Sequence, residues 1–81
     1  MNTITINNKE YKLKYTIRAL FIFEQITNKP FAINTLMDNY LFFYCILLAN
    51  NEDALEWDEF IDALDNEPNL LNELSSIVSK Q

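Results

Sequence analysis

The stretch richest in side chains that could do chemistry is Glu56–Leu64, EWDEFIDAL, in which four carboxylates are interleaved with two aromatic rings. Its spacing is that of the exit from an EF-hand calcium loop, whose twelfth position is a bidentate glutamate. With Glu59 at that position, the first position is Leu48, where a carboxylate is required, and the sixth is Asp53, where the sharp turn requires glycine. Two obligatory positions fail, so we interpret the segment as the acidic, solvated face of a helix.

Carboxylates also recur at helical spacing, as in Asp58 with Asp62 and Asp62 with Asp65. Such pairs can serve as acid and base when one of them is buried beside an apolar wall. Here they fall on the polar face of an amphipathic helix, with no cluster of Arg or His beside them and no glycine loop to hold a substrate. We therefore expect no catalytic residues, and we expect that the protein is not an enzyme.

The inventory of ligand and nucleophile side chains is also short. The chain has no His and a single Cys, which removes the usual ligands of zinc, iron and copper and the usual general base of hydrolases. We expect no metal and no cofactor. Cys45 cannot form a disulfide within the chain, which favours an intracellular, cytoplasmic setting.

Two further observations bear on location. Residues Met1–Lys9 lack the apolar core of a signal peptide. The longest apolar run, Tyr40–Ala49, has ten residues, about half of what crosses a bilayer. We expect no association with membranes.

Charge is distributed unevenly along the chain. Residues 1–30 hold five of the six basic groups and only two acidic ones, whereas residues 31–79 hold ten carboxylates and no Lys or Arg. The acidic part repels nucleic acid and anionic lipid. We therefore expect a protein partner and no nucleic acid.

The first elements predicted from the sequence are two strands. Residues 3–15 alternate with period two and form a β-hairpin if Asn8 and Lys9 make the turn, with Ile6 opposite Tyr11. That register puts all the large apolar groups on one face: Ile4, Ile6, Tyr11 and Leu13. A lone hairpin is marginal in water, so this face must rest on helices.

Helical periodicity follows the hairpin, with Thr16 as the first N-cap and a capping box formed by Thr35 and Asp38. Pro68 is well placed to be the first residue of the last helix. The predicted helices span about residues 17–27, 35–50, 57–65 and 68–79. The sequence thus predicts a single α+β domain over residues 1–81, with a two-stranded antiparallel hairpin packed on three to four short helices.

The helices over residues 17–27 and 35–50 are apolar around most of their circumference. Together they offer more apolar surface than a chain of 81 residues can cover, and a residual apolar patch on a small protein marks a surface for a partner or for self-association. Self-association into a homo-oligomer is therefore an alternative to binding of a partner. As contact residues we choose Phe31, Leu36, Tyr40, Tyr44 and Trp57, with Trp57 alternatively a lid over the core.

Several segments, taken in order, resemble a known family. They are the hairpin with EYKLKY at 10–15, IRAL at 17–20, the helix from Asn39-Tyr40 to Leu48-Ala49-Asn50, and DEFIDALD at 58–65. From about residue 3 to 78 the chain is similar to small tail assembly chaperones of long-tailed phages and prophages. Members often have Gly where this chain has Asn8 and Asn28, and Asn accepts the same backbone angles.

The resemblance implies a non-structural assembly factor in the bacterial host cell. Such a factor binds the helical tape measure protein, keeps its apolar surface from aggregating and hands it to the tail tube protein. A frameshifted longer form, frequent in such phages, is not visible in a sequence of 81 residues. Helix-in-groove recognition is the expected mode. The alternative is a small acidic regulator or inhibitor that binds a host protein, for instance as a mimic of nucleic acid.

Overall fold

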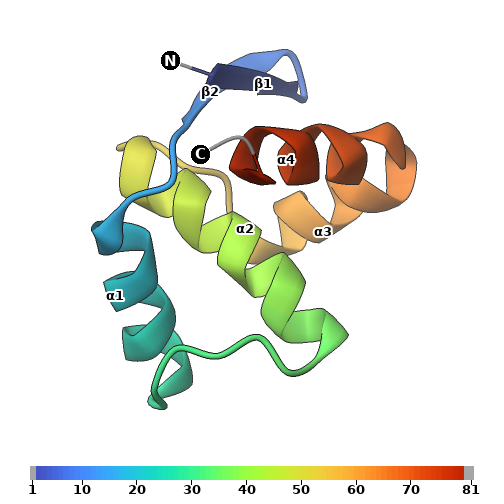
Figure 1. The fold of residues 1–81 in the computed structure, drawn as a ribbon. Coiled ribbons are helices and arrows are strands. Elements are labelled where there is room, and N and C mark those ends of the chain that lie inside the picture. Colours follow the sequence, from blue (N-terminus) through green and yellow to red (C-terminus); the bar gives the residue numbers. More distant parts are fainter. Residues whose placement is uncertain (1, 80–81) are drawn as a thin grey trace.

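The computed structural model describes residues 2–79, with side chains from 3 to 76, and contains a β-hairpin followed by four helices (Figure 1). This confirms the predicted α+β class. Met1, Lys80 and Gln81, which the predicted domain includes, lie outside the described residues. The elements are β1 (Asn2–Ile6), β2 (Lys9–Leu13), α1 (Ile17–Thr27), α2 (Leu36–Asn50), α3 (Trp57–Asn66) and α4 (Asn69–Ser79).

The hairpin turn lies one residue earlier than the sequence analysis placed it. Asn7 and Asn8 have φ of 53° and 66°, and the strands pair Ile4 with Tyr11 and Ile6 with Lys9. The predicted Asn8–Lys9 turn was therefore wrong. A tight two-residue hairpin of the favoured type needs a positive φ at both central positions, and Asn tolerates that conformation better than Lys does.

The shift leaves the two faces of the hairpin unchanged. The partner of Ile6 moves by two residues, from Tyr11 to Lys9, and side chains two apart on a strand share a face. The predicted apolar face is buried as expected: Ile4, Ile6, Tyr11 and Leu13. Thr3, Thr5, Lys12 and Lys14 are exposed.

Local side-chain bonds set the ends of α1 and α2. The Thr16 hydroxyl accepts a hydrogen bond from the Ala19 N–H at 3.2 Å, and α1 stops where Asn28 adopts a left-handed φ of 58°. At the start of α2, Thr35 and Asp38 form the predicted capping box, with the Asp38 N–H donating to the Thr35 hydroxyl at 3.1 Å. These caps satisfy backbone N–H groups that have no partner within the helix.

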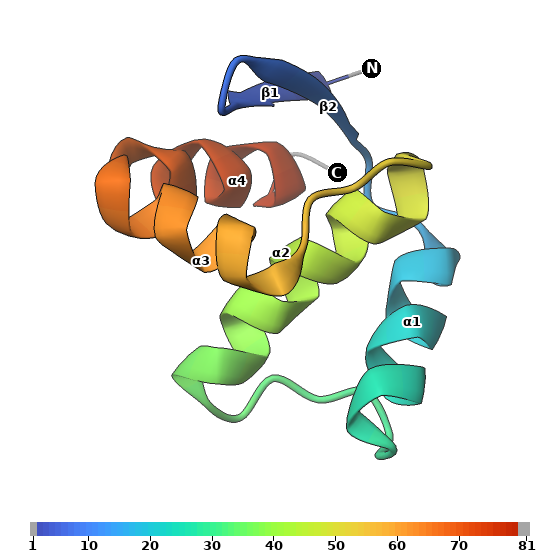
Figure 2. The ribbon, with the colours of Figure 1, turned by 180° about the vertical axis from the view of Figure 1, so that it is seen from behind.

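Helix α2 is the centre of the fold, with α1 on one side and the α3–α4 pair on the other (Figures 1 and 2). Five of its side chains are buried: Phe42, Phe43, Cys45, Ile46 and Leu47. A helix covered on several sides needs no polar face, which explains the uninterrupted apolar run.

The hairpin and the last two helices complete the core. Phe60 of α3 and Leu74 of α4 have no exposed surface. The apolar face of the hairpin lies over α4 and the end of α2 (Figures 1 and 2). Helix α4 begins at Asn69, so Pro68 directly precedes it and is not its first residue.

Candidate protein interface

The surface carries several large apolar side chains. Seven of those described are between 40% and 70% exposed: Tyr15, Ile17, Phe21, Ile26, Ile33, Leu36 and Met37. They come from α1, from the segments flanking it and from the first turn of α2. Leu36 and Met37 are the most exposed, at 70% and 68%. Scattered single residues of this kind are normal on a protein surface, so what matters is whether they join a larger apolar surface.

Leu36 and Met37 do continue into a larger surface. Tyr40 follows them one helical turn later on the same side of α2, and Tyr44 follows Tyr40 by another turn. Half-buried apolar residues of α3 and α4 lie next to these two tyrosines. We call this surface the α2–α3 band and define it by Leu36, Met37, Tyr40, Tyr44, Trp57, Ile61, Leu64 and Leu71.

A pocket of about 230 Å³ lies in the middle of the band, where α2, α3 and α4 meet. Its walls are apolar side chains, and its polar rim is a carboxylate: Tyr40, Ile61, Leu64, Pro68, Leu71 and Asp65. A depression of this size has room for one or two side chains.

The far end of the band is held in place by an aromatic cluster. The ring of Tyr44 meets Trp57 edge-on with centroids 5.3 Å apart and lies 5.5 Å from Phe60. The Tyr44 hydroxyl donates to the Leu55 carbonyl at 2.9 Å. Burial, and secondarily the carboxylate of Glu56, raises the pKa of Tyr44. Tyr44 thus acts as a fixed neutral donor, and Trp57 both covers the core and faces the band.

The structure brings together four of the five contact residues chosen from the sequence. Leu36 is exposed, and Tyr40, Tyr44 and Trp57 are half-buried on the same band. Phe31 lies elsewhere, because its ring packs 5.1 Å from Phe23 and 5.3 Å from the Phe42 ring between α1 and α2. Phe31 therefore closes the core at the α1 side and is not part of the band.

Sequence reasoning missed Met37 and the outer side of α1. Ile17 and Phe21 are 64% and 59% exposed, while Ala19 and Phe23 of the same helix are buried. Ile17 and Phe21 are four residues apart and so share a face, which was visible in the sequence. The sequence offered no sign of which apolar face would turn outward.

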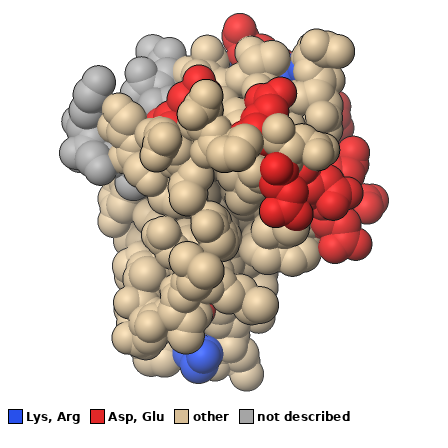
Figure 3. Space-filling model, turned by 90° about the vertical axis from the view of Figure 1, so that its right-hand side faces the viewer, with Lys and Arg blue, Asp and Glu red and all other residues tan. Residues whose placement is uncertain are grey.

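Negatively charged side chains border the band along α3. The exposed carboxylates of α3 are Asp58, Glu59, Asp62 and Asp65. Figure 3 shows the side of the molecule where α2 begins: carboxylates gather along its upper and right-hand parts, whereas its lower part shows almost no carboxylate and a basic patch at the lower edge. An apolar surface with one acidic border suits a partner that is apolar on one side and basic beside it.

Neither a metal site nor a reactive thiol is present among the described residues. No group of three or more His, Cys, Asp or Glu side chains within residues 3–76 could hold a metal ion. Burial raises the pKa of the Cys45 thiol to about 11, which leaves little of the nucleophilic thiolate at neutral pH.

The length and apolar character of a helix decide whether it can cross a bilayer. In the part of the chain that the structure describes, no helix has both the length and the apolar character needed to span a membrane.

Comparison with known proteins gives no relative: no family model, curated protein or solved structure shows significant similarity to this chain.

Proposed function

We propose that this protein acts by binding and not by catalysis, and that its α2–α3 band receives the apolar side of an amphipathic helix from a protein partner. The observation that carries the proposal is the exposure of Leu36 and Met37, 70% and 68%, directly beside the apolar pocket at Tyr40. Recognition of this kind uses anchors spaced by three, four and seven residues on the incoming helix. One anchor fits the pocket and the next covers Leu36 and Met37.

The chemistry of the partner follows from the border of the band. Asp65 lies on the rim of the pocket, and Asp58 and Asp62 are exposed on the same helix. Lys or Arg beside the apolar stripe of the incoming helix would be attracted to these carboxylates. The charge adds mainly to the association rate and to specificity, while the apolar contacts supply the affinity.

Within this class we propose a tail assembly chaperone of a phage or prophage, acting in the cytoplasm of the bacterial host. Its partners would be the tape measure protein and, after it, the tail tube protein. A small acidic protein with an exposed apolar band suits such a task, because it covers apolar helix surface and adds net charge that keeps the complex in solution.

A small acidic regulator that binds a host protein is the second candidate, favoured by the exposed carboxylates of α3 (Figure 3). The two candidates differ in their response to salt. A complex that depends on the carboxylates weakens strongly between low and high ionic strength, whereas one that depends on the band does not.

The test is co-expression with a tape measure protein of a long-tailed phage, with soluble tape measure protein as the readout. The variant Leu36→Ser with Met37→Ser should leave the partner insoluble. The matched control, Ile17→Ser with Phe21→Ser, removes comparable exposed apolar surface from α1 and should keep it soluble. All four side chains are more than half exposed, so each single change should cost under about 1 kcal/mol.

Two results would contradict the proposal. The first is equal partner solubility with the parent and with the Leu36/Met37 variant, which would remove the band from binding. The second is a tape measure protein whose solubility does not depend on this chain at all. A salt-sensitive complex with a DNA-binding host protein would favour the regulator instead.

A further inference from the structure

The two edges of the hairpin differ in whether their backbone groups are satisfied. On β2, the Lys12 N–H donates to the Asn51 side-chain oxygen at 2.8 Å, and the Asn51 amide nitrogen donates to the Lys12 carbonyl at 2.9 Å. Asn50 donates in the same way to the Lys14 carbonyl at 2.8 Å. The side chain of Asn51 thus makes the pair of bonds that a neighbouring strand would make, and it closes this edge at Lys12.

Within residues 3–76, the outer edge of β1 has no such partner. In an antiparallel pair, residues alternate between bonding across the ladder and pointing outward. Because Lys12 points outward on β2, its partner Thr3 points outward on β1, and so does Thr5. Among residues 3–76, no other side chain or backbone group bonds to the outward N–H and C=O of Thr3 and Thr5.

The sequence of β1 does not protect this edge either. Natural edge strands are commonly blocked by Lys, Pro or a bulge. Residues 2–6 read NTITI, without charge or proline, and they pair in regular register. Charged residues lie instead on β2, the strand whose edge Asn51 covers at Lys12. The open edge is therefore a template for one more strand.

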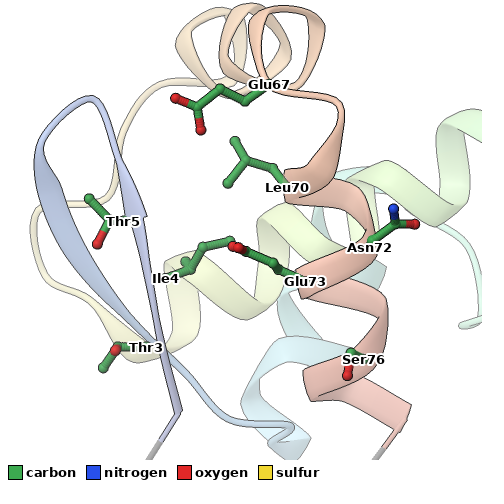
Figure 4. Close-up of a pocket in the computed structure, with 8 residues that line it drawn as sticks. All are labelled: Thr3, Ile4, Thr5, Glu67, Leu70, Asn72, Glu73 and Ser76. Atoms are coloured by element: carbon green, nitrogen blue, oxygen red, sulfur yellow. The ribbon is translucent and has the colours of Figure 1, made fainter.

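A groove lies beside the open edge, between β1 and α4, with a volume of about 590 Å³. Figure 4 shows Thr3 and Thr5 on one side of it and the carboxylates of Glu67 and Glu73 directed from the other side toward β1. Leu70 contributes an apolar floor, and no Lys or Arg among residues 3–76 lines the groove. The groove thus has acceptors for positive charge next to free backbone donors and acceptors.

We propose that this edge binds an extended segment of a partner protein as a third strand, with Lys or Arg on the side that faces α4. The backbone of the segment would bond to Thr3 and Thr5, and its cations would meet Glu67 and Glu73. This is strand addition, a mode in which backbone bonds give affinity and alternate side chains give specificity. The site is separate from the α2–α3 band and does not depend on the function proposed for the band.

A second copy of this chain does not fit the groove as well. If β1 of one copy paired with β1 of another, the added strand would bring no Lys or Arg, since NTITI contains none. It would also bring a second set of acidic groove residues, in a protein whose net charge is already −6. Like charges placed this way disfavour the pairing.

The first experiment uses fluorescein-labelled peptides and fluorescence anisotropy with the full chain. The probes are acetyl-Lys-Val-Lys-Val-Lys-amide, its Glu counterpart, and the Lys peptide with alternate backbone nitrogens methylated. The Lys peptide should bind saturably and the Glu peptide should not. Methylation removes the backbone donors but keeps the charge, so it should weaken binding by about tenfold or more.

Variants of the chain locate the site. Thr5→Pro removes an outward N–H without touching a ladder bond, and proline is tolerated on an edge strand in that position. It should abolish binding of the Lys peptide. Glu67→Gln with Glu73→Gln should weaken binding severalfold, whereas Asp58→Asn with Asp62→Asn, the same change in charge on α3, should leave it unchanged.

Three outcomes would overturn the proposal. They are the absence of saturable binding of the Lys peptide, equal binding of its methylated form, and equal weakening by the two pairs of carboxylate changes. The methylated peptide is tested on the parent chain, so the result stands even if Thr5→Pro fails to fold. A dimer in sedimentation that Thr5→Pro dissociates would assign the edge to a second copy and also refute the proposal.

Discussion

Asn51 offers the sharpest test of how the hairpin is attached to the helices. Besides its two bonds to Lys12, its side chain donates to the Leu47 carbonyl at 2.9 Å, and it sits one residue after the end of α2. One side chain thus ties the edge of β2 to the last turn of the core helix. The change Asn51→Ala removes all three bonds and leaves the backbone otherwise intact.

The expected cost follows from these bonds. A hydrogen bond contributes about 0.5–1.5 kcal/mol net. Lys12 is exposed, so water replaces part of what is lost there, and we expect about 2 kcal/mol in total. A domain of 81 residues is stable by about 4–12 kcal/mol, so this is a large fraction. The urea midpoint should fall by about 1–2 M.

Two measurements check this. Urea denaturation followed by circular dichroism gives the free energy of unfolding, and NMR hydrogen exchange reports the Lys12 N–H directly. In the parent that amide should exchange slowly, and in Asn51→Ala it should lose its protection. Asn51→Asp should separate the bonds, because a carboxylate still accepts from the Lys12 N–H but cannot donate to the carbonyls of Lys12 and Leu47.

The control is Asn72→Ala on the exposed side of α4, where no side-chain hydrogen bond is present among the described residues. It should change stability by less than about 0.5 kcal/mol. If Asn51→Ala and Asn72→Ala cost the same, or if the Lys12 amide stays equally protected, then the side chain of Asn51 does not close the edge of β2.

Three further predictions concern the core, the α2 cap and the thiol. Phe23→Ala should cost about 3–5 kcal/mol because Phe23 is 2% exposed, whereas Phe21→Ala on the same helix should cost under about 1 kcal/mol because Phe21 is 59% exposed; thermal unfolding compares them. Hydrogen bonding from the Asn34 N–H lowers the pKa of Asp38 below its ordinary 3.8. The stability that the Asp38 carboxylate contributes is therefore complete above pH 3.8 and is lost as the pH falls through the lower pKa of the folded state. Asp38→Asn should therefore reduce stability at neutral pH and flatten its decline in acid, and an unchanged acid limb would refute this. Burial raises the pKa of Cys45 to about 11, so the thiol should react with Ellman's reagent far more slowly in the folded protein than in urea. Stability should also fall as the pH rises from about 9 toward 11, because the thiol of the unfolded chain ionises first. The variant Cys45→Ala should lack that decline.

Much of the fold could be predicted because its signals are local. The Thr16 cap, the Thr35–Asp38 box and the apolar face of the hairpin each depend on residues that are close in the chain. The turn was placed one residue late, at Asn8 and Lys9, although a positive φ at both central positions favours the adjacent pair Asn7 and Asn8. The assignment of side chains to the two faces of the hairpin was still correct, because side chains on a strand repeat every two residues.

The candidate site was predicted only in part. Leu36, Tyr40, Tyr44 and Trp57 share a surface, and helical spacing alone puts the first three on one side of α2. Phe31 was chosen by the same reasoning and yet packs on Phe23 and Phe42. Nothing in the sequence near an aromatic residue in a loop shows whether it turns inward or outward.

The sequence by itself determined the type and order of the helices and strands, the ends of the helices to within one residue, which side chains alternate together and that the second half is acidic. The tertiary structure alone decided that Phe21 is exposed while Phe23 is buried, that Asn51 bonds to a strand 39 residues away, and that β1 keeps an open edge beside Glu67 and Glu73. The reason is the separation along the chain over which each interaction acts. Caps and periodicity act over three or four residues, whereas exposure and edge pairing depend on which distant segments pack against each other.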